Sequence, residues 1–306
     1  MIQNIRKITF FMILALCNIS NGFTYQHEIS AVLIFKDEGP YLKEWIEYHK
    51  LIGVEHFYLY NNGSTDNYRR ILDPYIKSRE VELFNASYFS PHLRKFDAIQ
   101  RNAYKDAIKR SKDKTKWLLV IDSDEFVVPV KSYKLNTFLK GYENESIGGV
   151  YLWWVWFGTS NVPRIPSNRL LIETLQLNKG HIGAGKSLIR PDRVRNVINP
   201  HKCSYMKNYV CKEISYTRAQ INHYWFRDEY YAYKHKWPRR KNWGLSYDNF
   251  KSMIDGANKK NQQYFKPITK YIKPLRAKIF PAKPLAQKDE IQKKQNRKDR
   301  RRSGRR

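Results

Sequence analysis

Trp117-Leu118-Leu119-Val120-Ile121-Asp122-Ser123-Asp124-Glu125-Phe126 is the stretch that decides the fold. Its apolar run ends in polar residues, a pattern that predicts a strand buried on both faces. Asp122 and Asp124 then fall at the carboxyl end of this strand, where open α/β sheets bind ligands. In extended backbone, residues i and i+2 point the same way, so both carboxylates can converge on one divalent cation that bridges a diphosphate. The alternative is an ordinary turn, because Asp and Ser are common turn residues.

Strand and helix patterns alternate along the first half of the chain. Buried strands are predicted at residues 30–35, 54–60 and 81–84, and helices at residues 41–52, 67–78 and 93–110. This alternation predicts an α/β fold with a mainly parallel sheet and helices on both faces. The second half is less regular; strands are predicted at residues 148–157, 180–191 and 221–226, and a basic, aromatic helix at residues 228–241.

The composition describes a globular, strongly basic protein. The chain has 306 residues, of which 42% are hydrophobic, so it can build a large core. Its formal net charge is +29, which indicates an anionic partner such as a nucleotide, an acidic glycan, nucleic acid or a membrane surface. Charge alone does not select among these partners.

The two ends of the chain differ from its middle. Arg6 and Lys7 precede a short apolar run, so residues 1–25 are predicted to be a signal peptide or an uncleaved membrane leader. Residues 26–273 form the predicted domain, and residues 274–306 are expected to be a basic, disordered tail that can touch an anionic membrane surface. We therefore expect a membrane-associated protein, or one in the secretory lumen or exported, rather than a free cytosolic one. Cys203 and Cys211 can form a disulfide or remain two buried thiols.

Polar clusters follow three predicted strands of the first half. They are Asp37 with Glu38, the segment 61–66 with Asn61 and Asp66, and the Asp122/Asp124 pair. In a parallel sheet these strand ends share one edge, which favours a single ligand site. Asp66 can equally be a helix cap. The chain has no Walker A sequence and no GxGxxG, which disfavours a P-loop kinase and a dinucleotide enzyme.

The same clusters carry a family resemblance. Lys36-Asp37-Glu38, the helix sequence at residues 41–49, the segment 53–66 and the segment 117–129 resemble glycosyltransferase family 92 and its family 2-like relatives. Shorter matches are Gly185-Lys186-Ser187, Pro200-His201 and Asn222-His223-Tyr224. The resemblance covers roughly residues 29–245 and is most specific in its N-terminal half.

This resemblance implies a GT-A fold, in which a Rossmann-like nucleotide half is fused to an acceptor-binding half. It implies a nucleotide-sugar donor, typically a UDP-sugar, and a divalent metal, Mn²⁺ or Mg²⁺. Asp122 and Asp124 match the metal and diphosphate residues. Glu38 and Asp66 match the residues that hold the base and ribose, and the expected nucleotide-binding group also includes Asp37 and Asn61.

Two further residues have a functional and a structural interpretation. His223 is a candidate third metal ligand, because a neutral imidazole can complete such a site, although a lone histidine is often structural. Lys186 can neutralise the departing diphosphate, or it can be an exposed lysine in a basic protein. Trp153, Trp154 and Trp156 suit either a sugar platform or the core.

The resemblance leaves the catalytic base open. An inverting transferase needs a group that deprotonates the acceptor hydroxyl, and Asp192 and Glu173 are the weak candidates. The expected function is metal-dependent, inverting transfer of a sugar from a nucleotide-sugar to a glycan, lipid or protein hydroxyl. The alternative is a non-catalytic secreted basic protein that binds acidic glycan or nucleic acid. It explains the charge but not the three strand-end clusters, and we do not expect nucleic acid as a partner.

Overall fold

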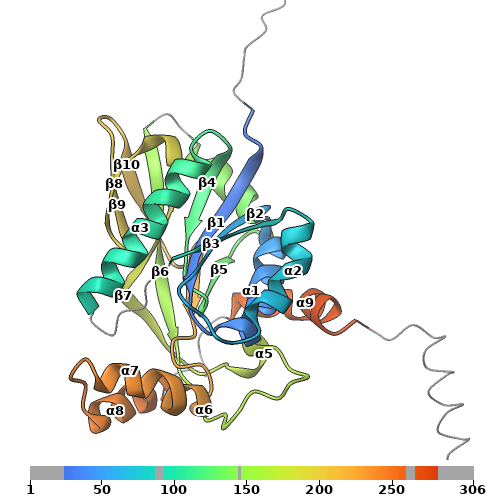
Figure 1. The fold of residues 1–306 in the computed structure, drawn as a ribbon, viewed down its shortest axis with the longest axis vertical. Helices are drawn as coiled ribbons and strands as arrows, with labels where there is room; N and C mark the ends of the chain where they lie inside the picture. The colour runs from blue at the N-terminus through green and yellow to red at the C-terminus, as the bar shows by residue number, and fades with distance from the viewer. Residues whose placement is uncertain (1–23, 87–92, 144–145, 260–265, 282–306) are drawn as a thin grey trace, which may run out of the picture.

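The computed structural model describes residues 24–86, 93–143, 146–259 and 266–281 (Figure 1). The central strand of its first half is β1 (His27–Phe35), which pairs in parallel with β2 (His56–Asn61) and β4 (Thr115–Val120). The edge strand β3 (Val81–Asn85) pairs in parallel with β2. All four strands therefore end at the same edge of the sheet, as the sequence predicts.

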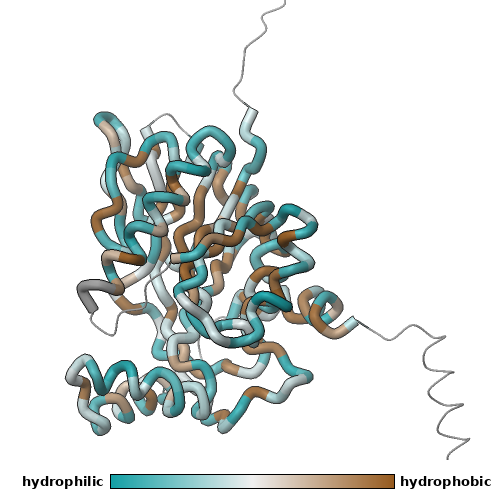
Figure 2. Tube along the Cα trace, viewed as in Figure 1, coloured by the Kyte–Doolittle hydropathy of each residue, from teal (hydrophilic) through white to brown (hydrophobic). Residues whose placement is uncertain are grey.

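Helices cover both faces of this parallel part. α1 (Gly39–Ile52) packs on the face that carries Ile29, Ala31 and Leu33, and α2 (Tyr68–Lys77) lies beside α1 (Figure 1). α3 (Leu93–Ser111) packs on the opposite face, against the alternate β1 residues. Because β1 is buried on both faces from Ile29 onward, its residues 31–35 are all apolar. In Figure 2 the hydrophobic residues lie along the strands, and the hydrophilic ones lie on the outer sides of the helices.

The second half of the chain extends the same sheet. β7 (Asn178–Ile189) runs antiparallel between β4 and β6 (Ile147–Phe157), and β11 (Ala219–His223) pairs in parallel with β6. β5 (Glu125–Pro129) closes the far edge beside β11, and β10 (Val210–Ile214) also pairs with β6. The described residues thus form a nine-stranded sheet with the order β3-β2-β1-β4-β7-β6-β11-β5 and β10 on β6. A separate hairpin joins β8 (Val194–Asn199) and β9 (Lys202–Tyr205).

A layer of short helices lies across one end of the sheet, next to α5 (Leu171–Thr174) (Figure 1). It comprises α6 (Glu229–Tyr231), a π-helical turn (Ala232–Lys236), α7 (Trp237–Lys241) and α8 (Tyr247–Asn258). Phe226 packs with Phe250 and Ile254 to give this layer a small core of its own. The predicted helix over 228–241 is therefore three consecutive helical pieces.

The helices α4 (Leu135–Leu139) and α9 (Ile272–Ile279) lie on the α1 side, and α9 extends past residue 273, where the predicted tail begins. Leu275 is fully buried against the core, so the packed domain continues through α9. The rest of the predicted tail, from residue 282, and residues 1–23 of the predicted leader lie outside the described residues. No helix in the described ranges is long and apolar enough to cross a membrane. Cys203 and Cys211 are both free thiols.

Candidate active site

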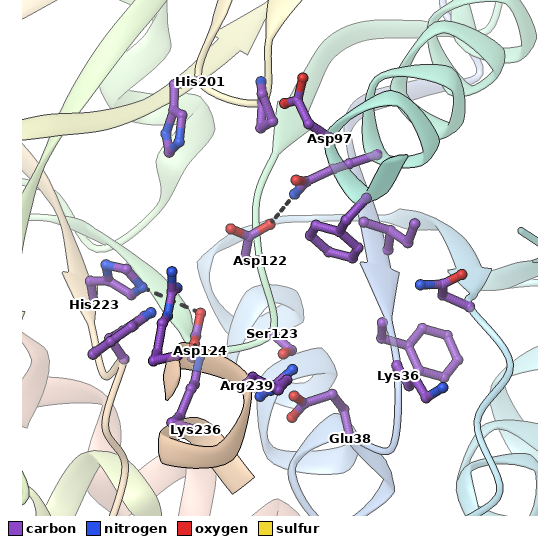
Figure 3. Close-up of a pocket in the computed structure, with 18 of the residues that line it drawn as sticks. Lys36, Glu38, Asp97, Asp122, Ser123, Asp124, His201, His223, Lys236 and Arg239 are labelled. Carbon is purple, nitrogen blue, oxygen red and sulfur yellow. Dashed lines mark hydrogen bonds and ion pairs between the residues drawn. The ribbon is translucent and has the colours of Figure 1, made fainter. Parts of the chain in front are cut away.

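A cavity of about 640 Å³ opens at the carboxyl ends of β1, β2 and β4. Its walls come from the first half of the chain on one side and from the C-terminal helices on the other (Figure 3). The polar and charged residues that line it are Lys36, Glu38, Asn62, Asp97, Gln100, Asp122, Ser123, Asp124, Lys186, Asn199, His201, His223, Lys236, Arg239, Arg240 and Asn242. Its volume suits a ligand of nucleotide-sugar size.

The Asp122/Asp124 motif forms a turn rather than an extended strand end. β4 ends at Val120, and the backbone N–H of Glu125 donates to the carbonyl oxygen of Asp122 at 3.2 Å. The Trp45 indole N–H donates to the carbonyl oxygens of both residues at 3.1 Å, which fixes the turn. The expected extended geometry is therefore wrong, because the chain must reverse here to start β5. The two carboxylates consequently meet different partners.

Asp122 faces α3 and β7. Its Oδ1 accepts hydrogen bonds from Gln100 and Tyr104, each at 3.1 Å, and its Oδ2 lies 2.8 Å from the Lys186 ammonium. Lys186 is fully buried, and although burial opposes its charge, Asp122 raises the pKa of the lysine above its usual range. The residue before Lys186 is Gly185, which lets β7 approach β6 closely, because a Cβ on residue 185 would lie 1.9 Å from the Leu152 carbonyl oxygen. Lys186 is thus a charged wall of the cavity and not an exposed lysine.

Asp124 faces the C-terminal half of the molecule. Its Oδ2 lies 2.8 Å from the Lys236 ammonium, and its Oδ1 lies 3.4 Å from His223 Nε2 (Figure 3). Burial alone would raise the pKa of Asp124, but Lys236 and His223 outweigh burial and hold that pKa well below its usual range. Burial lowers the pKa of His223, which favours the neutral imidazole. Asp124 is therefore an ionised carboxylate beside a neutral histidine.

Glu125 is the third acidic residue of the turn and has a different state. Its side chain is fully buried, and its Oε2 accepts the backbone N–H of Asp122 at 2.9 Å. Burial raises its pKa well above the usual range, and the neighbouring carboxylates of Asp122 and Asp124 raise it further. A neutral Glu125 therefore supports the turn without adding negative charge to it.

A buried cluster around Glu38 closes the cavity near the turn. The Glu38 carboxylate pairs with Arg227 Nη1, and the Tyr231 hydroxyl donates to Glu38 Oε1 at 2.9 Å. Arg227 also donates to Ser123 Oγ at 3.2 Å, and its guanidinium lies 3.6 Å from the ring centre of Tyr41. Its φ of 52° is in the left-handed region, which costs energy for a residue with a side chain. These contacts bind the C-terminal helices to the β1 and β4 loops.

The other expected nucleotide residues have structural partners and do not line the cavity. Asp37 Oδ1 accepts the backbone N–H of Thr65 at 2.7 Å. Asp66 accepts the backbone N–H of Gly39 at 2.7 Å and that of Tyr68 at 3.2 Å, so it caps the starts of α1 and α2. The contacts of Asp66 are therefore those of a helix cap.

Asn61 and Asn62 follow the carboxyl end of the same strand but have different surroundings. Asn61 Oδ1 accepts the N–H of Ser64 at 2.9 Å, and its amide donates to the Tyr68 hydroxyl at 3.0 Å. Asn62 is 1% exposed and lines the cavity, and neither its Oδ1 nor its Nδ2 has a hydrogen-bond partner among the described residues. A buried amide without partners is costly, so a ligand is the natural partner for it.

The two carboxylates considered as bases lie elsewhere. Asp192 is near Arg190 and Arg193 on the α3–β8 side of the molecule and lines a second, smaller groove. Glu173, on α5, accepts a hydrogen bond from Arg276 and pairs with Arg169. The structure does not bring either residue into the cavity.

The tryptophans of β6 divide between the two roles considered for them. Trp154 lines the cavity, with its ring centre 4.3 Å from that of His223. Trp156 packs on Trp225 and Phe226, and Trp153 packs on Tyr151. Trp154 alone of the three is therefore placed as a platform for a ligand.

A divalent cation fits part of the predicted donor set. Asp124 supplies a hard carboxylate oxygen, and neutral His223 supplies an imidazole nitrogen 3.4 Å away, a pairing that Mn²⁺ and Mg²⁺ sites can use. Asp122 is turned toward Lys186 instead. Within the described ranges, no three His, Cys, Asp or Glu side chains gather closely enough to hold a metal by themselves. A cation at Asp124 and His223 therefore needs further oxygen ligands, which a diphosphate can supply.

Comparison with known proteins identifies the family. The model of glycosyltransferase family 92 matches residues 31–269. The chain belongs to glycosyltransferase family 92. Family 92 relatives from Oryza sativa subsp. japonica and Arabidopsis thaliana are 26% and 23% identical, each over 65% of this chain and over 33% and 35% of the relative. A Ricinus communis relative is 24% identical over 56% of this chain and 30% of its own length, so the chain spans about a third of these relatives.

Solved structures of glycosyltransferases are also similar to this family 92 chain. S. aureus TarS 1-349 has 10% identity and a TM-score of 0.37, with 75% of this chain and 70% of TarS covered. Glucosyl-3-phosphoglycerate synthase from Mycobacterium tuberculosis, in complex with Mn²⁺ and UDP-glucose, has 15% identity and a TM-score of 0.28 over 42% of this chain and 44% of that one. The expected α/β fold, with a mainly parallel sheet and helices on both faces of its first half, is confirmed.

Sequence reasoning did not single out four residues of this family 92 site. Asn62, Arg227 and Lys236 reach the cavity or its wall only through the tertiary fold, and His201 was noted only within a short family match. For Asn62 a signal existed, because it follows the same strand end as Asn61. For Arg227 and Lys236 no local spacing distinguishes them from the other basic residues of the C-terminal half.

Proposed function

We propose that this protein transfers a sugar from a nucleotide-sugar donor to a hydroxyl group of a glycan, lipid or protein acceptor, with inversion at the anomeric carbon. One observation carries the proposal: the Asp122/Asp124 turn lies at the floor of a cavity of about 640 Å³ that also contains two buried lysines. A site that combines carboxylates with buried cations suits a diphosphate leaving group. Family 92 membership supports the same reaction class.

The donor nucleotide fits the half of the cavity built by β1, β2 and α3. Asn62 offers an amide without partners to a base or ribose, and Gln100 lies beside Asp122 at the position proposed for the diphosphate. Phe35 and Phe96 add apolar surface. We propose a UDP-sugar as the donor, because the family resemblance of the sequence implies one.

Two residues are proposed to hold a divalent cation, Mn²⁺ or Mg²⁺. Asp124 and His223 supply the protein ligands, and such a cation stabilises negative charge on a diphosphate. Lys186 keeps its proton because Asp122 lies 2.8 Å away, so it adds positive charge beside the leaving group. Lys236 lies 2.8 Å from Asp124 and approaches the turn from the other side.

His201 is the proposed base. Its Nδ1 lies 3.0 Å from the Gly185 carbonyl oxygen, so Nδ1 carries the proton and Nε2 carries the lone pair. Burial lowers its pKa, and Lys186 lowers it further, so the imidazole is neutral near pH 7. His201 lines the cavity, whereas Asp192 and Glu173 do not. A neutral imidazole of this kind can accept the proton of an acceptor hydroxyl.

We propose that the protein acts at a membrane or in the secretory lumen, because its leader-like segment and basic charge favour both. The experiment that tests the reaction is a thermal-shift screen of nucleotide-sugars with Mn²⁺, followed by measurement of UDP release from the hits. We expect one donor to raise the melting temperature, because binding to the folded state stabilises it. A protein that neither binds nor hydrolyses any donor would be a binding module and not a transferase.

A further inference from the structure

Two arginines of the cavity lack a carboxylate partner. Lys186, Lys236 and Arg227 are each paired with an acidic side chain. Arg239 and Arg240, on α7, also line the cavity, but no Asp or Glu of the described residues forms an ion pair with either one. Arg239 donates from Nε to the backbone carbonyl oxygen of His235 at 3.2 Å. The α7 side of the cavity therefore has positive charge that the protein does not balance by direct pairing.

Arg240 lies against two indoles. Its guanidinium carbon lies 4.6 Å from the ring centre of Trp225 and 4.4 Å from that of Trp243. Burial and, to a smaller extent, the neighbouring Arg239 lower its pKa to about 10, so the side chain remains charged at neutral pH. When rings cover the faces of a guanidinium, its N–H edge stays available for bidentate contact with an anion. The site is thus organised to receive a phosphate or a carboxylate.

The position of α7 separates this charge from the donor. The donor half is built by Asn62, Gln100 and Asp122, from the first half of the chain. α7 lies beneath the carboxyl ends of the strands (Figure 1), and together with Trp225 it lines the wall of the cavity that belongs to the C-terminal helices and not to the first half of the chain. An aromatic face next to a cation suits a sugar that carries an anionic substituent.

We propose that the acceptor carries a phosphate group near the hydroxyl that receives the sugar, and that Arg239 and Arg240 bind this phosphate. Two adjacent guanidiniums match the charge and the several oxygens of a phosphate ester better than those of a single carboxylate. The inference rests on the proposed transferase function and names its substrate class. It also gives part of the net charge of +29 a specific role.

The test uses inorganic phosphate as the probe and UDP with Mg²⁺ to fill the donor half. Calorimetry first measures UDP binding, and then phosphate binding to the UDP-saturated protein. We expect phosphate to bind wild type, and Arg240→Gln to weaken it at least about tenfold while the UDP affinity stays within about twofold. Lys241→Gln removes the same charge from the same helix but lies outside the cavity, so it should change neither affinity.

Each other result overturns the proposal. If wild type binds UDP but no phosphate, or if Arg240→Gln binds phosphate normally, α7 does not form the site. If Arg240→Gln weakens UDP binding as much as phosphate binding, the arginine binds the donor and not the acceptor. If wild type does not bind UDP, the transferase function fails, and the inference fails with it. Melting curves verify folding, and Arg240→Lys, which keeps the charge but loses the fork, replaces Arg240→Gln if that variant is unfolded.

Discussion

Lys236, on the π-helical turn after β11, lies 2.8 Å from Asp124, which is 112 residues earlier in the chain. The ion pair joins the C-terminal helices to the floor of the cavity. Because His223 contacts the other oxygen of the same carboxylate, a ligand that reaches Asp124 meets groups from both halves of the protein. π-Helical turns are frequent at functional sites, and this one places its last residue at the proposed reaction centre.

The first prediction concerns the cation. We expect His223→Gln to weaken Mn²⁺ binding to the UDP-loaded protein at least about tenfold, because it removes one of two proposed protein ligands. Electron paramagnetic resonance of free Mn²⁺ measures this without any turnover. His181→Gln, an exposed histidine on β7 outside the cavity, is the matched control. Equal Mn²⁺ affinity in wild type and His223→Gln would remove His223 from the metal site.

The second prediction contrasts two neighbouring asparagines. Asn62→Ala should lower UDP affinity by about tenfold, because the amide that would meet the nucleotide is lost. It should leave thermal stability unchanged or raise it, because the side chain makes no hydrogen bond in the protein. Asn61→Ala should instead lower thermal stability and leave UDP affinity unchanged, because Asn61 forms hydrogen bonds with Ser64 and Tyr68. Calorimetry and melting curves on both variants check the contrast, which the opposite pattern would refute.

The third prediction concerns the buried pair Arg227 and Glu38. Arg227→Met should destabilise the protein by about 3–5 kcal/mol, because it leaves Glu38 buried without its cation. Adding Glu38→Gln should recover part of that loss. Urea unfolding of wild type, both single variants and the double variant gives the coupling energy. Arg69→Met, which breaks an exposed pair with Asp73, should change stability by less than about 0.5 kcal/mol. Additive effects of the two mutations would show that the pair is not coupled.

The fourth prediction concerns pH. Glu44 Oε2 and Oε1 accept the backbone N–H groups of Leu171 and Ile172 at 2.9 and 3.1 Å. Burial nevertheless raises the pKa of Glu44 to about 7. Between pH 4.5 and 7 the folded state therefore holds a proton on Glu44 that the unfolded state has released. The contribution of Glu44 to the free energy of unfolding is present at low pH and is lost as the pH rises toward 7.

We therefore expect Glu44→Gln to remove a pH-dependent contribution to the free energy of unfolding of up to about 3 kcal/mol. The stability difference between wild type and Glu44→Gln, measured by urea unfolding at pH 5, 6, 7 and 8, should change between pH 5 and 7 and then level off. Glu55→Gln, on the surface near Glu28, is the control and should show no such change. A constant difference across the series would show that Glu44 titrates normally.

The sequence by itself determined the parallel half of the fold. The apolar run before Asp122 and the helical spacing around Trp45 are local patterns, and burial on both faces of a sheet leaves few other ways to satisfy them. The common edge of the strand ends followed from the same alternation. The family resemblance, in turn, singled out Asp122, Asp124, Lys186 and His223 as candidate site residues.

Only the tertiary structure decided how these residues meet. The reversal into β5 turns Asp122 toward Lys186 and Asp124 toward Lys236, which extended geometry did not anticipate. Asp66 became a cap because the starts of α1 and α2 lie beside it. Arg240, the proposed phosphate ligand, meets the Trp225 indole because α7 packs next to the segment after β11. Such pairings depend on which distant segments pack together, and local periodicity in a sequence does not encode that choice.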